Sequence, residues 1–124
     1  CRTAGHGDSH KLPLQVSKDS HPWGDQVDGP WELRHAVRLR LRENPDAIKI
    51  WATGGGIWRW DSGRRQLMST EEIKAVADEC KLTGIPLWSH SYNSVSAAYD
   101  SVRFGAEQLI HGFELDDKTM NLMA

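Results

Sequence analysis

Three short apolar runs in the second half of the chain constrain most strongly how it can fold. Strands are expected at 47–52 (AIKIWA), 85–89 and 107–110. Segments with helical periodicity lie before, between and after these runs; helices are expected from 28 or 29 to 44, at 69–82, from 93 or 94 to 105, and from 116 onward. Strands that alternate with helices in this way predict an α/β fold with a parallel sheet.

The expected helices carry recognisable start and stop signals. Pro30 suits the first turn of a helix, where its missing N–H is not needed. Ser69 and Glu72 have the spacing of a capping box, and Gly84 is typical of a helix end.

A lysine and two histidines lie in or directly after the apolar runs, namely Lys49, His90 and His111. Parallel strands end at one edge of a sheet, and neighbours lie about 4.8 Å apart, so the three side chains are expected to converge there on one cavity. Imidazole is a common zinc ligand, and the pattern therefore indicates part of a metal site. Lys49, between Ile48 and Ile50, is expected to be a buried amine able to take up carbon dioxide as a carbamate. The alternatives are a solvent-facing lysine and two purely structural histidines.

Composition excludes several classes of function. Lys and Arg number 15 against 17 Asp and Glu, and no long basic block occurs, which argues against nucleic acid and anionic membranes as partners. No apolar run approaches the roughly 20 residues that span a bilayer. Two cysteines cannot form a disulfide framework, which slightly favours a reducing compartment such as the cytoplasm.

Several other features support only expectations about packing. Residues 1–30 are polar and rich in Gly, Pro and His, and they are expected to form a loop that partly covers the site. Gly54-Gly55-Gly56 lacks the context of a phosphate loop and favours an active-site loop. Cys80 is expected in the core, the six tryptophans mostly in the core or the pocket wall, and the arginines at 34, 38, 40 and 42 on a solvated helix face.

Four stretches together resemble the metal-dependent amidohydrolases, in the branch related to imidazolonepropionase, prolidase-like dipeptidases and ochratoxinase. They are TAGHGD at 3–8, AIKI at 47–50 with TGG at 53–55, SHSY at 89–92, and LIHG at 109–112. The resemblance implies a (β/α)8 barrel, of which this chain holds the central strands four to six. Residues 1–30 would be the active-site loop region after strand three, and 31–124 the central βα units.

The resemblance also implies the roles of individual residues. Lys49, carboxylated by carbon dioxide, would bridge two divalent metal ions, most simply zinc, with His90 and His111 as further ligands. Tyr92 and His6 would contact the substrate. The family's His-x-His pair and its aspartate base do not occur here, so the chain is expected to be an internal piece of a longer protein.

The expected reaction is hydrolysis of an amide or peptide-like C–N bond in a small molecule, such as an N-acyl amino acid or a dipeptide. The expected partners are the remainder of the barrel and, in a homo-oligomer, further copies. An alternative is a catalytically incomplete fragment or split-barrel component with no activity alone. A third interpretation is a flavodoxin-like binding module. The absence of a phosphate-binding motif argues against it.

Overall fold

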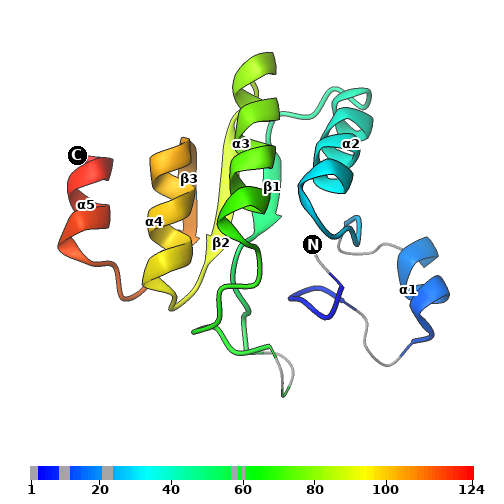
Figure 1. Ribbon diagram of the computed structural model, residues 1–124, viewed down its shortest axis with the longest axis horizontal. Helices are drawn as coiled ribbons and strands as arrows, with labels where there is room; N and C mark the ends of the chain where they lie inside the picture. Colours follow the sequence, from blue (N-terminus) through cyan, green and yellow to red (C-terminus); the bar gives the residue numbers. More distant parts are fainter. Residues whose placement is uncertain (1–2, 9–11, 21–23, 57–58, 60) are drawn as a thin grey trace.

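The computed structural model describes residues 3–8, 12–20, 24–56, 59 and 61–124. Its elements follow the expected alternation of helices and strands (Figure 1). They are α1 (Leu14–Ser20), α2 (Pro30–Leu41), β1 (Ile48–Trp51), α3 (Thr70–Thr83), β2 (Leu87–Ser91), α4 (Val95–Phe104), β3 (Ala106–His111) and α5 (Asp117–Met123). The chain is therefore a mixed α/β protein.

The strands form a parallel sheet in the order β1-β2-β3. Trp51 is the register partner of His90, and Ser91 is that of His111. The carboxyl ends of the strands consequently lie at one edge of the sheet. Residues 3–8 and the loop after β1 gather at this edge (Figure 1).

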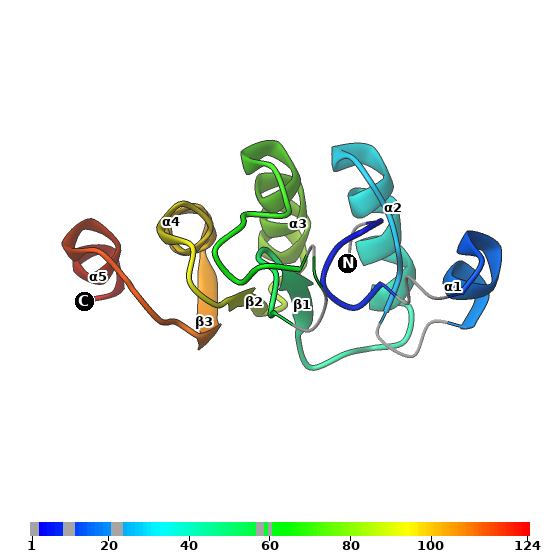
Figure 2. The same cartoon turned by 90° about the horizontal axis from the view of Figure 1, so that it is seen from below.

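The helices α2, α3 and α4 pack against one face of the sheet (Figure 2). Ile48 and Ile50 of β1 and Leu87 of β2 point into this layer, where they meet Ile73 and Val76 of α3. Ile73 and Val76 are fully buried. Burying each such side chain contributes about 1.5–3 kcal/mol, so this layer holds the strands in place.

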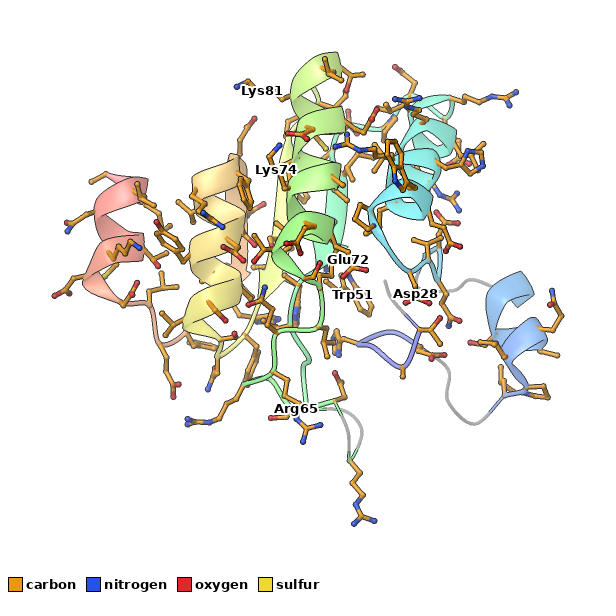
Figure 3. All side chains as sticks on the ribbon, viewed as in Figure 1. Asp28, Trp51, Arg65, Glu72, Lys74 and Lys81 are labelled. Atoms are coloured by element: carbon orange, nitrogen blue, oxygen red, sulfur yellow. The ribbon has the colours of Figure 1, made fainter. Side chains whose placement is uncertain are left out.

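The helix ends follow the sequence signals. The Ser69 hydroxyl accepts from the Glu72 N–H at 3.2 Å, and Glu72 accepts from the Ser69 N–H at 2.7 Å, which completes the capping box. Gly84 ends α3 with a φ of 70°, in the left-handed region that glycine tolerates best. Glu72 also accepts from the Gly29 N–H at 2.8 Å, so the starts of α2 and α3 are joined near Asp28 (Figure 3).

Ion pairs connect α2 to α3 along their length. Arg34 and Arg38 both donate to the carboxylate of Glu79, whose side chain is only 4% exposed. Hydrogen bonds from Arg38, and then from Arg34, hold the pKa of Glu79 below its usual value despite burial. The arginine face is only partly solvated as expected: Arg38 and Arg42 are exposed, but Arg34 is half-buried and pairs, like Arg38, with a carboxylate of the neighbouring helix.

Three expectations about local structure need correction or adjustment. Residues 1–30 are not all loop, since α1 forms there although its sequence lacks a strong apolar stripe. Trp31 is 82% exposed at the start of α2 rather than buried, whereas Trp23, Trp58 and Trp60 lie outside the described residues. β2 begins and ends two residues later than expected, which places His90 inside the strand.

The expected position of Cys80 is confirmed. Cys80 is a core residue, and burial raises the pKa of its thiol to about 11. Within the described ranges, no helix combines the length and apolar character needed to cross a bilayer.

Candidate functional site

The face of the sheet opposite α3 and α4, called the site face below, carries Lys49 of β1 and His90 of β2. Side chains alternate along a strand, so Lys49 and Trp51 point away from the core residues Ile48 and Ile50. The Lys49 Nζ lies 5.3 Å from the centroid of the Trp51 ring. Lys49 is exposed and not buried as expected, because it points to the side of the sheet that the helices leave uncovered.

His90 lies at the centre of the site face and is only 3% exposed. Burial, and then electrostatic repulsion from His6, His111 and Lys49, lower its pKa to about 4, although a hydrogen bond with the Thr53 backbone acts in the opposite direction. The ring is therefore neutral at physiological pH. A neutral imidazole keeps the nitrogen lone pair that a metal ion requires.

His111 ends β3 beside His90. The two ring centroids are 4.8 Å apart and the rings meet edge to face. His111 has a φ of 76°, a left-handed conformation that residues other than glycine rarely adopt. Such unusual backbone is concentrated at functional sites, where surrounding contacts maintain it. The structure thus places Lys49, His90 and His111 on the same face of three adjacent strands.

His6 reaches the same place from the N-terminal segment. Its ring centroid lies 4.6 Å from that of His90 and 4.6 Å from that of Trp51, which stands at the end of β1 toward this segment (Figure 3). Its Nδ1 lies 2.7 Å from Asp61 Oδ2, and the other oxygen of Asp61 accepts from the Gly55 N–H at 3.0 Å. A Cβ at Gly55 would collide with the His6 ring, so glycine is required there for this close approach.

Asp61 was not assigned a role from the sequence. It lies in an irregular loop, where neither periodicity nor a motif marks it, yet it is 1% exposed and holds His6. Asp61 is identified only by its contact with His6, a residue far away in the sequence, which the three-dimensional structure reveals.

Aromatic side chains border the two strand-end histidines. The Tyr92 ring lies 5.1 Å from that of His111 and 5.3 Å from that of Phe113. The backbone holds these loops together, since the Phe113 N–H donates to the Tyr92 carbonyl at 3.1 Å. Tyr92, expected from the resemblance, is joined here by Phe113, which no sequence pattern had marked.

The donor set fits part of a metal site. Among the residues that the structure describes, no three His, Cys, Asp or Glu side chains come together as a metal site. His90 and His111 supply two imidazoles, and Lys49 becomes an oxygen donor only after carboxylation. Because zinc usually takes four ligands, these residues would hold a metal ion only together with further donors.

A cavity of about 410 Å³ lies along the outer edge of β1, between that strand and α2. Lys49 and Trp51 line it, together with core residues such as Leu33 and Val37. His90 and His111 do not line it, because they belong to the strands farther from this edge. This cavity therefore contains only one of the three residues, and the convergence of Lys49, His90 and His111 on one cavity stays a prediction.

Comparison with known proteins shows what this arrangement is similar to. The chain is 29% identical over 134 residues to the ochratoxinase of Aspergillus niger, covering 98% of the chain and 28% of that protein. Its structure matches the crystal structure of A. niger ochratoxinase with a TM-score of 0.87 over 98% of the chain. The match to an amidohydrolase has a TM-score of 0.80 at 30% identity, covering 99% of the chain and 32% of that structure. The resemblance to the amidohydrolase superfamily is confirmed.

A third solved structure points the same way. A Xaa-Pro dipeptidase with methionine bound in its active site matches with a TM-score of 0.81 at 28% identity, over 98% of the chain and 30% of that structure. No protein-family model matches the chain. The chain spans just under a third of the length of these amidohydrolase relatives, and its parallel sheet and covering helices correspond to part of their fold.

Proposed function

We propose that this chain is the central part of a metal-dependent hydrolase that cleaves an amide or peptide-like C–N bond. Its strands would be the fourth to sixth of a (β/α)8 barrel. The observation that carries the proposal is the placement of Lys49, His90 and His111 on one face of three adjacent parallel strands. Similarity to proteins named ochratoxinase, amidohydrolase and Xaa-Pro dipeptidase supports the class of reaction.

Lys49, His90 and His111 would hold two divalent metal ions, with zinc as the best match to the imidazole donors. When bound, such ions lower the pKa of a water molecule and polarise the scissile carbonyl. His90 is prepared for this role, because its lowered pKa keeps the ring neutral.

Carboxylation would convert Lys49 from a cation to an anion. Its neutral amine attacks carbon dioxide, a C–N bond forms, and one proton is released to give the carbamate. The product offers two oxygen atoms in place of one nitrogen. Exposure of Lys49 on the site face leaves room for this larger group.

Tyr92 and His6 would position the substrate. Tyr92 lies beside His111, where its phenol can donate to a substrate carbonyl or carboxylate. His6 is held by Asp61 directly against His90. Substrates of the N-acyl amino acid or dipeptide type combine the carbonyl and carboxylate groups that these side chains can bind.

Replacement of Lys49 in the intact protein tests the proposal. Lys49→Ala should remove zinc and activity together. Lys49→Arg should not restore either, because a guanidinium stays charged and cannot take up carbon dioxide. A short carboxylic acid added to the Lys49→Ala protein should restore part of the activity by replacing the carbamate. The measurements are zinc content by elemental analysis and turnover of a panel of N-acyl amino acids and dipeptides.

Lys81→Ala is the matched control, since Lys81 lies on α3, away from the site face (Figure 3). It should change neither zinc content nor turnover. Full zinc occupancy with unchanged turnover in Lys49→Ala would refute both the carbamate and the metal site.

A second candidate is that the 124-residue chain has no activity by itself. The donor count favours it, because the described residues bring together two histidines and one lysine but no complete metal site. Turnover by the isolated chain, measured beside the intact protein with zinc and bicarbonate present, distinguishes the two.

A further inference from the structure

Gly63, in the loop after β1, lies directly against the ring of Tyr92. A Cβ placed on Gly63 would be 2.5 Å from Cδ1, 3.1 Å from Cγ and 3.3 Å from Cβ of Tyr92, and no other atom beyond the chain neighbours of Gly63 would be nearer. Real Cβ atoms essentially never come within 3.0 Å of another heavy atom. Any side chain at position 63 would therefore collide with Tyr92 first.

The backbone of Gly63 is not what excludes a side chain. Its φ does not fall in the left-handed region, so no left-handed strain would oppose another residue there. Gly105 is the opposite case, because its φ is 104° while a Cβ on it would face open space. Glycine is required at position 63 because of the contact with Tyr92.

The loop that carries Gly63 is held in place and cannot simply move away. The Gly63 carbonyl accepts from the Asn93 N–H at 2.9 Å, which ties the loop after β1 to the residue that follows Tyr92. The Arg65 N–H donates to the Ser62 carbonyl at 3.0 Å and closes a turn that contains Gly63. A collision at Gly63 would consequently act on the ring.

Tyr92 is held from three sides. Its N–H donates to the Thr53 hydroxyl at 2.9 Å, and its carbonyl accepts from the Phe113 N–H at 3.1 Å. Its ring lies 5.1 Å from that of His111 and 5.3 Å from that of Phe113, with Gly63 against Cδ1. The loops that follow β1, β2 and β3 thus meet at Tyr92 and fix the direction of its ring.

We propose that Gly63 is a positioning residue that keeps the Tyr92 ring in the orientation needed to bind substrate. The inference rests on the function proposed above, in which the Tyr92 phenol donates to a carbonyl or carboxylate of the substrate. A ring displaced by a side chain at position 63 would settle in another staggered rotamer and carry its phenol away. The loss would fall on substrate binding, because neither Gly63 nor Tyr92 is among the proposed metal ligands.

The first test reads the contact by NMR in the zinc-free intact protein. The α-hydrogens of Gly63 should show a nuclear Overhauser effect to the ring hydrogens of Tyr92, whose signals are assigned by their loss in Tyr92→Ala. Gly63→Ala should shift these ring signals, and Gly105→Ala should leave them unchanged. Absence of the effect in the parent would overturn the proposal without any variant having to fold.

The second test measures the KM for N-acyl amino acids. Gly63→Ala should raise it by roughly 10–100-fold, the range for a lost hydrogen bond to a charged group, and zinc content should stay at the parent level. Tyr92→Phe should give a similar rise, because it removes the same phenol. In the Tyr92→Phe protein, Gly63→Ala should raise the KM no further, since two changes that act through one contact do not add.

Gly105→Ala is the matched control for replacing a glycine. It introduces left-handed backbone strain at the end of α4 but no collision, so it should lower stability and leave the KM unchanged. A purely structural effect of Gly63→Ala would instead raise the KM in the Tyr92→Phe protein as much as in the parent.

The outcomes separate this proposal from the proposed function. A parent-like KM in Gly63→Ala, a further rise in the Tyr92→Phe protein, or loss of zinc would overturn the role of Gly63. A parent protein that turns over none of the N-acyl amino acids and dipeptides would refute the proposed function instead, and the NMR measurement would still decide whether Gly63 holds Tyr92.

Discussion

The imidazole rings of His6 and His90 lie nearly face to face, with centroids 4.6 Å apart and planes inclined by 21°. The loop after β1 holds both rings, since Asp61 contacts Nδ1 of His6 and Thr53 contacts Nδ1 of His90. A segment with little regular structure thus fixes the orientation of two histidines that come from distant parts of the chain.

Replacement of Asp61 should disturb His6 and leave the metal ligands in place. Asp61→Ala removes the partner of His6 Nδ1 and should lower the free energy of unfolding by about 1–3 kcal/mol, as expected for a buried bond to a carboxylate. The KM for N-acyl amino acids should rise while zinc content stays at the parent level. Steady-state kinetics and elemental analysis measure the two effects, with His6→Ala as the comparison. Loss of zinc with an unchanged KM would assign Asp61 to the metal site instead.

Stability of the zinc-free protein should fall in acid because of His90. Its pKa is about 4 in the folded protein and near 6.5 when unfolded, so between these values the unfolded state binds the extra proton. The contribution is fully present above pH 6.5 and is lost as the pH falls to 4, amounting to roughly 3 kcal/mol at most. Denaturant unfolding at a series of pH values measures it. His90→Asn should show a smaller decrease over the same range, and an identical decrease would exclude His90 as the source.

Loss of the Ser69 cap should destabilise α3. Ser69→Ala removes the acceptor of the Glu72 N–H and should lower the free energy of unfolding by about 1 kcal/mol. Ser94 is a matched control, because it also precedes a helix but its side chain makes no capping bond. Denaturant unfolding of both variants gives the comparison; a larger loss in Ser94→Ala would contradict the importance of the capping box.

The core between α3 and the sheet should be sensitive to cavities. Ile73 is fully buried, so Ile73→Ala should lower the free energy of unfolding by about 2–5 kcal/mol. Leu82, on the same helix, is 76% exposed, and Leu82→Ala should change stability by no more than about 0.5 kcal/mol. Thermal or denaturant unfolding measures both variants. Similar losses of stability in the two would show that Ile73 does not lie in the hydrophobic core.

Local signals made the second half of the fold predictable. Each apolar run became a strand, and Ser69, Gly84 and Gly105 mark helix ends as expected, since capping depends on residues close in sequence. Lys49, His90 and His111 could be selected because parallel strands bring corresponding ends together. Whether they bind metal remains a prediction.

Other features depend on contacts between distant residues and could not be predicted. The pairing of Arg34 and Arg38 with Glu79 requires the relative placement of two helices. Asp61 and Thr53 acquire their roles only when the loop after β1 folds against His6 and His90. The exposure of Lys49 depends on what covers the site face, which the pattern of β1 alone does not specify.

The alternation of side chains along β1 also restricts where the chain can gain or lose residues during evolution. Deleting one residue before Lys49 within the strand would turn the lysine toward α3 and an isoleucine toward the histidines, so one event would damage both stability and chemistry. Changes of length between Gly56 and Asp61 would leave this facing intact. Relatives of the chain should therefore tolerate insertions and deletions in that loop far more readily than in the strand that precedes it.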